Sequence, residues 1–203
     1  MSIWYGANVA DESELRLCGD LAGKRVIELG VTGPSGVVTP NSVTAALAGA
    51  KAMALDPNPQ AIAAVRVAAE SAEITVQCHQ GELADLGFAT SASVDLVVAS
   101  HTLAGVDDLP RLLRQVHRVL KPGAPFVVAM RHPIAAMFSG PDQSATHTAT
   151  AAYGANSITF TELYMAFERS NFRLDVVHEL NDQRVRDALC PAVLVLRARK
   201  QGD

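Results

Sequence analysis

The stretch from Val26 to Pro57 limits the fold of this chain more than any other. It begins with the short run VIEL, continues through a loop that contains three glycines, and reaches an acid, Asp56, at the end of a second apolar run, KAMALD (51–56). The segment between the loop and the second run, SVTAALAGA (42–50), is rich in good helix formers. A strand, a glycine-rich loop, a helix and a second strand in this order predict a βαβ unit with two parallel strands.

The alternation of apolar runs and helical patterns continues through the middle of the chain. ITVQCHQG (74–81), VDLVVAS (94–100) and APFVVAMRH (124–132) are runs typical of buried strands. The segments 57–73 and 107–120 place apolar residues at helical spacing. Strands that alternate with helices predict a doubly wound, Rossmann-like α/β fold with a mostly parallel sheet that helices cover on both faces.

The two ends of the chain complete the expected fold. In the N-terminal segment (1–22), Asp11 is a good N-cap with acids in the following turn, which predicts a helix over 11–21. Near the other end, a helical pattern at 160–171 precedes two apolar runs at 174–180 and 192–200. These runs are close enough in sequence to pair as an antiparallel hairpin, which brings the expected sheet to seven strands.

Composition excludes several classes of partner. The net charge is -4 and the Lys and Arg residues are scattered, so we expect neither nucleic acid nor a membrane surface as a partner. No leader-like or membrane-spanning apolar run is present, which predicts a cytoplasmic protein. Three separated cysteines (Cys18, Cys78 and Cys190) and six dispersed histidines predict neither disulfides nor a metal site. A chain of 203 residues is expected to form one domain over 1–203.

The glycine loop and Asp56 locate the expected ligand. In a doubly wound fold, ligands lie at the carboxyl ends of the strands, near the point where the strand order reverses. Gly30, Gly33 and Gly36 allow the backbone to approach a ligand closely. A carboxylate at Asp56 can accept both hydroxyls of a ribose. A nicotinamide dinucleotide and S-adenosylmethionine both fit these features.

Glu28 separates the two cofactors, because it lies two residues before Gly30. An acid this close to the ligand would repel a pyrophosphate but attract an ammonium or sulfonium group. This favours S-adenosylmethionine. A nicotinamide-dependent oxidoreductase remains the less favoured alternative.

Five stretches, in their order and spacing, resemble the successive motifs of class I S-adenosylmethionine-dependent methyltransferases. They cover about Gly23 to Met130, and both ends of the chain resemble a small bacterial subgroup of these enzymes. The resemblance implies methyl transfer from S-adenosylmethionine to a small molecule, with S-adenosylhomocysteine as the product. The stretches are VIELG (26–30), LDPNPQAI (55–62), GELADL (81–86), VDLVVASHTL (94–103) and LLRQVHRVLKPGAPFVV (112–128).

The resemblance also implies which residues bind the cofactor. Asp56 would hold the ribose, Glu82 and Leu83 the adenine, and Glu28 the methionine amino group. These residues also have structural alternatives: Asp56 can be a strand-end acid that caps the next helix, Glu28 can satisfy loop amides, and Glu82 can be a solvent-facing turn acid. Trp4 and Tyr5, which could close over the cofactor, can simply pack the terminal segment. The expected cofactor-binding residues are Tyr5, Glu28, Gly30, Thr32, Gly33, Asp56, Pro57, Glu82, Leu83, Ser100 and His101.

The glycine loop departs from the family pattern ELGxGxG, because valine and threonine stand between Gly30 and Gly33. Gly30 and Asp56 are 26 positions apart, against about 20 in related nucleotide folds. The extra residues are most simply placed at TGPSGVVTP (32–40). The longer loop either wraps the methionine end of the cofactor or obstructs the pocket, which would make the protein a non-catalytic binding module.

Methyl transfer from a sulfonium is an in-line displacement in which the protein mainly orients the acceptor and excludes water. If a hydroxyl is methylated, His101 or His132 could take its proton, because each follows the end of a strand. Both can equally be loop histidines bonded to backbone. We expect residues 133–157 and the N-terminal segment to enclose a small, neutral or apolar acceptor, and the protein to be a homodimer.

Overall fold

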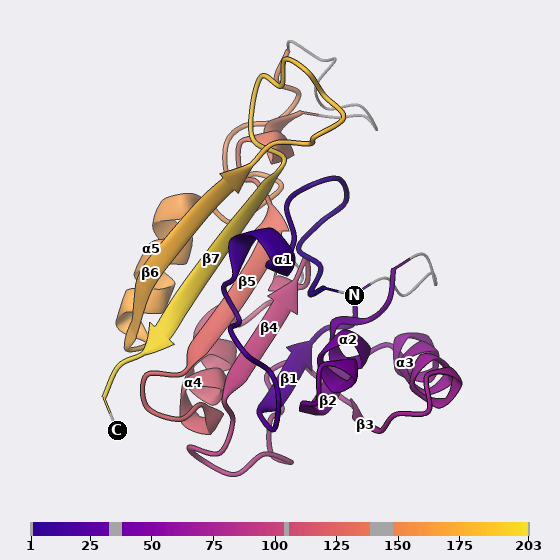
Figure 1. The fold of residues 1–203 in the computed structure, drawn as a ribbon. Helices are drawn as coiled ribbons and strands as arrows, with labels where there is room; N and C mark the ends of the chain where they lie inside the picture. Colours follow the sequence, from indigo (N-terminus) through magenta and orange to yellow (C-terminus); the bar gives the residue numbers. More distant parts are fainter. Residues whose placement is uncertain (1, 33–37, 104–105, 139–147, 203) are drawn as a thin grey trace.

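The computed structural model describes residues 2–32, 38–103, 106–138 and 148–202. Within them, seven strands form one sheet in the order β3-β2-β1-β4-β5-β7-β6 (Figure 1). Strands β1 to β5 run parallel, and β7 is antiparallel to both β5 and β6. The predicted Rossmann-like sheet with a C-terminal antiparallel hairpin is therefore confirmed. The strands are β1 (Arg25–Leu29), β2 (Lys51–Asp56), β3 (Val76–Gln80), β4 (Leu96–Ser100), β5 (Pro125–Arg131), β6 (Phe172–Leu180) and β7 (Val193–Lys200).

The burial of each strand follows from its place in the sheet. All five residues of the central strand β4 are buried, and β1 is buried after its first residue. Burial on both faces explains why these strands read as continuous apolar runs. The edge strand β6 instead alternates between more and less exposed residues, as expected where one face meets solvent.

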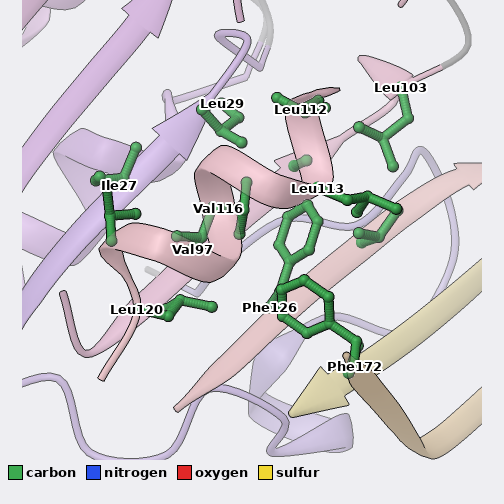
Figure 2. Packing of buried hydrophobic residues seen from close by; sticks show 14 of the residues in the cluster. Ile27, Leu29, Val97, Leu103, Leu112, Leu113, Val116, Leu120, Phe126 and Phe172 are labelled. Carbon is green, nitrogen blue, oxygen red and sulfur yellow. The ribbon is translucent and has the colours of Figure 1, made fainter. Parts of the chain in front are cut away.

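Helices cover both faces of the sheet. On one face, Leu112, Leu113 and Val116 of α4 lie in a common core with Ile27 of β1 and Phe126 of β5 (Figure 2). The intervening strand residues point the other way and pack against α2, α3 and the N-terminal segment. The helices are α1 (Glu12–Leu15), α2 (Asn41–Leu47), α3 (Pro59–Ser71), α4 (Leu109–Val119), the 3₁₀ helix η2 (Ala135–Met137) and α5 (Phe160–Arg169).

The N-terminal helix is shorter than predicted, and the predicted span of 11–21 is wrong. Asp11 caps it as expected, but α1 ends at Leu15 and Arg16 takes a left-handed conformation with φ 53°. The Glu12 carboxylate accepts hydrogen bonds from the backbone N–H groups of residues 17–19. These bonds hold the chain in a turn, because the same N–H groups would bond to backbone carbonyls in a continued helix.

The segment expected to enclose an acceptor, 133–157, lies partly outside the described residues. Its described part holds η2 and a series of turns. In the part of the chain that the structure describes, no helix has both the length and the apolar character needed to cross a bilayer. No three His, Cys, Asp or Glu side chains of these same residues come together as a metal site would require.

Candidate functional site

The candidate site lies at the carboxyl ends of β1, β2 and β4. Strand β1 pairs with β2 on one side and with β4 on the other, so the chain leaves β1 and β4 in opposite directions across the sheet (Figure 1). Such a reversal of strand order opens a crevice above the strand ends. Gly30, Asp56 and Ser100 lie there, at or just after the last residues of the three strands.

Asp56 has acceptor capacity left for a ligand. Its Oδ2 accepts from the backbone N–H of Val31 at 2.7 Å, and its Oδ1 accepts from the N–H of Asn58 at 2.7 Å. An ionised carboxylate offers about four lone-pair positions, so each oxygen keeps one. The side chain is only partly buried, and Pro57 beside it is exposed. This geometry suits the two adjacent hydroxyls of a ribose.

Glu28 is instead buried among donors of the protein itself. Its Oε1 accepts from Thr32 N–H at 2.9 Å, from the Thr32 hydroxyl at 2.6 Å and from Asn41 N–H at 3.0 Å. Its Oε2 accepts from Ser42 N–H at 2.8 Å. The side chain is 1% exposed, and three of the four bonds fall on Oε1, so burial, rather than a lack of lone pairs on Oε2, closes this carboxylate to a ligand. The geometry therefore fits the alternative in which Glu28 satisfies loop amides.

The Glu28 carboxylate also caps the start of α2. The N-cap of this helix is Pro40, and no side chain of its own caps it. The first N–H groups of α2 instead bond to Glu28. A dinucleotide fold places the ligand pyrophosphate at this position. A buried carboxylate here would repel a phosphate, which counts against a nicotinamide cofactor.

Position 30 must be glycine because a neighbouring side chain leaves no room for a Cβ. The sequence did not indicate this contact. Its backbone has φ +72°, and a Cβ at this position would lie 2.1 Å from Cγ2 of Thr102. Thr102 is held there because its hydroxyl donates to the Leu29 carbonyl at 2.8 Å. Gly33, the second predicted glycine of the loop, lies outside the described residues.

The N-terminal segment crosses the strand ends and is fastened there by polar side chains. Asn41 bonds to both backbone groups of Trp4: Trp4 N–H donates to Asn41 Oδ1 at 2.8 Å, and Asn41 Nδ2 donates to the Trp4 carbonyl at 3.0 Å. The Ser100 hydroxyl donates to the same carbonyl at 3.0 Å. Residues 2–6 are called the strap below. Ser100 is thus placed at the site, as the sequence predicted for its position, but its hydroxyl is engaged by the strap.

Tyr5 is placed in the core rather than open to a ligand. Its side chain is 1% exposed, and its hydroxyl donates to Glu12 Oε2 at 2.6 Å and lies 3.2 Å from the Cys18 sulfur. Burial, with Cys18 and Glu12 nearby, raises the pKa of the Tyr5 phenol far above its ordinary value. The neutral ring packs the terminal segment, which matches the structural alternative for this residue.

His101 lies at the site as a neutral imidazole. Its Nε2 is 2.8 Å from the Tyr5 carbonyl, and since a carbonyl only accepts, Nε2 carries the proton and Nδ1 does not. Burial lowers the pKa of His101, although the bond to Tyr5 acts in the opposite direction. The residue has φ 62°, an uncommon conformation outside glycine.

Both ring nitrogens of His132 bond to groups outside the strap. Its Nε2 lies 2.9 Å from Glu179 Oε1, and its Nδ1 accepts from Ile134 N–H at 3.2 Å. The imidazole is buried. Both ring nitrogens therefore have partners within the protein, as in the alternative of a loop histidine bonded to backbone.

Glu82 and Leu83 follow β3 at the expected adenine end. Glu82 is largely exposed and pairs with Arg111 at 3.2 Å, as a solvent-facing turn acid would, while Leu83 packs against the large core. Gly81 N–H donates to the Asp56 carbonyl, which ties this turn to the end of β2. A cavity of about 440 Å³ adjoins the turn. Its lining residues are Leu55, Cys78, His79, Gln80, Gly81, Asp85, Gly87 and Phe88.

Comparison with known proteins identifies a related family. The family model described as a methyltransferase domain matches residues 35–128. Among curated proteins, no significant match to the sequence was found.

Solved structures similar to this one extend the likeness to nearly the whole chain. An S-adenosylmethionine-dependent methyltransferase from Mesorhizobium loti has a TM-score of 0.70 at 23% identity, over 89% of this chain and 93% of that one. One from Aquifex aeolicus has a TM-score of 0.68 at 14% identity, over 93% and 88%.

Geranyl diphosphate C-methyltransferase from Streptomyces coelicolor, solved with Mg²⁺, a substrate analogue and S-adenosylhomocysteine, has a TM-score of 0.68 at 15% identity, over 93% of this chain and 74% of that one. The chain therefore has the fold of the class I S-adenosylmethionine-dependent methyltransferases and matches the methyltransferase domain family over residues 35–128, which confirms the resemblance that its motifs indicate.

Proposed function

We propose that the protein binds S-adenosylmethionine above the carboxyl ends of β1, β2 and β4 and transfers its methyl group to a small-molecule acceptor. The observation that carries this proposal is the carboxylate of Asp56, which ends β2 with one acceptor position open on each oxygen. The resemblance in sequence motifs and fold supports the same cofactor. The bound cofactor supplies the activated methyl group and leaves as S-adenosylhomocysteine.

The chain's own residues divide the work of binding. Asp56 and Pro57 hold the ribose, and the turn at Glu82 and Leu83 meets the adenine. Gly30, Thr32 and Gly33 shape the loop toward the methionine end, and Glu28 acts through the loop amides that it orders. Ser100, His101 and Tyr5 contribute through the strap, as a wall of the site.

We expect the strap and the segment 133–157 to supply the residues that meet the acceptor. We propose a neutral or apolar acceptor of modest size, because small and weakly polar residues prevail in this segment. If the acceptor is a hydroxyl, the unprotonated Nδ1 of His101 can take its proton, whereas His132 would first have to leave Glu179 or Ile134. The same proposal includes a single domain over 1–203, a cytoplasmic location and a homodimer. Light scattering of the purified protein tests the homodimer.

Calorimetric titration tests cofactor binding. We expect micromolar binding of S-adenosylmethionine and S-adenosylhomocysteine, no binding of NADH, and an affinity about 100-fold weaker in Asp56→Ala, because two hydrogen bonds to a charged acceptor are lost. Asp20→Ala is the matched control, since Asp20 is exposed and bonds only to a neighbouring N–H group. Binding that survives Asp56→Ala unchanged would contradict the proposed ribose contact.

A second candidate function is a non-catalytic binding protein of the same fold. The specific observation in its favour is the engagement of site groups within the protein: Glu28 is buried and bonded to loop amides, Ser100 holds the strap, and Thr102 lies over Gly30. A folded protein that binds neither S-adenosylmethionine nor S-adenosylhomocysteine would favour this candidate over the enzyme.

A further inference from the structure

We propose that Asn41 is a positioning residue that couples the cofactor site to the strap, so that binding of the cofactor orders the N-terminal segment as a wall of the reaction site. This inference rests on the proposed function. It goes beyond it because it assigns a role to a residue outside the expected cofactor contacts and predicts a response of the strap to the ligand.

The side chain of Asn41 is committed to the strap. Its amide pairs with both the N–H and the carbonyl of Trp4, at 2.8 and 3.0 Å, in the two-bond pattern that a neighbouring strand would provide. The same Nδ2 lies 3.2 Å from the Ser100 hydroxyl. The residue is 2% exposed, and loss of this amide would leave the Trp4 N–H without its partner and the Trp4 carbonyl with the Ser100 hydroxyl.

The backbone of Asn41 is committed to the cofactor site. Its N–H donates to Glu28 Oε1 at 3.0 Å and to the Thr32 hydroxyl at 3.0 Å. Thr32 in turn donates to the same carboxylate oxygen through its own N–H and hydroxyl. One residue therefore joins the Glu28 network under the glycine loop to the strap above it, and displacement at either end is felt at the other.

Two further polar bonds fasten the strap at the end of β4. Ser100 donates to the Trp4 carbonyl, and His101 Nε2 bonds to the Tyr5 carbonyl. Ile3 and Tyr5 are almost fully buried on either side of Trp4. Asn41 is the member of this set that also contacts Glu28 and Thr32 through its backbone, which makes it the link between ligand and strap.

Trp4 makes this coupling measurable, because it is the one tryptophan in the sequence. Its ring lies 5.5 Å from the ring of His101, centroid to centroid. Tryptophan emission therefore reports the strap alone. S-adenosylhomocysteine is the probe, with its affinity measured separately by calorimetry so that binding and strap response are read independently.

We expect saturating S-adenosylhomocysteine to change Trp4 emission in the unmodified protein. In Asn41→Ala, the dissociation constant should rise about tenfold, because ordering of the strap no longer adds to binding. Emission at saturation should then remain at the value of the free protein. A residue with a merely structural role would lower stability without uncoupling emission from binding.

Two control variants sharpen the test. Asn181→Ala removes an exposed asparagine from the connection between β6 and β7 and should leave affinity and emission response unchanged. Ser100→Ala removes one donor to the Trp4 carbonyl but keeps the Asn41 pair, so its emission response should persist. If Asn41→Ala does not fold, acrylamide quenching of Trp4 in the unmodified protein still decides, because bound ligand should lower the quenching constant.

The outcomes separate this inference from the proposed function. If the unmodified protein binds the probe but Trp4 emission and quenching do not change, the coupling is wrong and the proposed function stands. A full emission response in Asn41→Ala overturns the role of Asn41. If the folded, unmodified protein does not bind the probe, the proposed function fails and the coupling fails with it.

Discussion

The ends of β1 and β2 each present an acid, and the two acids differ in what surrounds them. Glu28 is buried and receives four hydrogen bonds from residues 32, 41 and 42. Asp56 is partly exposed and receives two, from Val31 and Asn58. Burial and the donors already present decide whether a carboxylate can serve a ligand.

The difference follows from the elements that meet at each strand end. β1 is central in the sheet, and the start of α2 closes over it with N–H groups that have no partner within the helix. β2 lies one place nearer the edge, and α3 has its own cap in Asn58. Glu28 thus completes the fold, whereas Asp56 keeps the acceptor positions that the proposed ribose contact would use.

Isosteric amides at the two acids should give the largest difference. Glu28→Gln replaces an acceptor with an NH₂ group that faces N–H donors, so we expect the free energy of unfolding to fall by about 4 kcal/mol. Asp56→Asn should cost about 1 kcal/mol, because water can reach its side chain. Urea unfolding measures both. Equal losses would mean that burial and bonding within the protein do not separate the two acids.

The sheet could be predicted from the sequence because its strands are local apolar runs. β1, β4 and β5 lie in the interior, so their sequences show continuous hydrophobicity, and the hairpin of β6 and β7 needs only a short connection. The predicted length of the N-terminal helix was wrong because the Glu12 carboxylate accepts hydrogen bonds from the backbone N–H groups of residues 17–19. No pattern of helix formers reveals such a contact.

The site could be predicted only in part. Asp56 stands out because it ends a strand ahead of a helix, which is a local signal. Asn41 and Thr102 were missed because their partners are distant in sequence: Asn41 lies 37 positions from Trp4, and Thr102 lies 73 from Leu29. The one available hint for Thr102 was the glycine at position 30, which the sequence assigned to approach of a ligand.

Substitution of Gly30, which follows the last residue of β1, should give the next largest loss in the free energy of unfolding. Gly30→Ala should lower the free energy of unfolding by about 3 kcal/mol, from left-handed strain and a clash with Thr102. Gly123→Ala is a matched control with the same φ of +72° and open space around it, and should cost about 1 kcal/mol.

A double-mutant cycle isolates the contact with Thr102. Because Gly30→Ala in the background of Thr102→Gly has no side chain to meet, we expect a favourable coupling of about 2 kcal/mol between the two changes in urea unfolding. Additive losses would show that the clash is relieved by movement of the backbone, and that the packing over Gly30 is not fixed.

The smallest expected effect is a pH dependence of the free energy of unfolding, which comes from His101 where the strap meets the end of β4. His101 keeps an exposed surface, but desolvation of its ring lowers its pKa, so the unfolded chain binds a proton more readily than the folded one. Stability from this residue is therefore present above the unfolded pKa of about 6.5 and is lost as the pH falls below it. Carboxyl groups such as Asp175, held below their usual pKa by Arg197 and Arg199 against the opposing effect of burial, act at lower pH.

His101→Gln tests this effect, because an amide can still donate to the Tyr5 carbonyl but cannot take up a proton. Unfolding free energies between pH 7 and 5 should decline in the unmodified protein and decline less in the variant. If both decline equally, the acid-side loss comes from other groups, and the strap is fastened to β4 by hydrogen bonds whose strength does not depend on the charge of His101. A steeper loss in the unmodified protein would instead place a pH-sensitive contact at the strap, beside Trp4, so that the response of Trp4 to ligand should weaken at low pH.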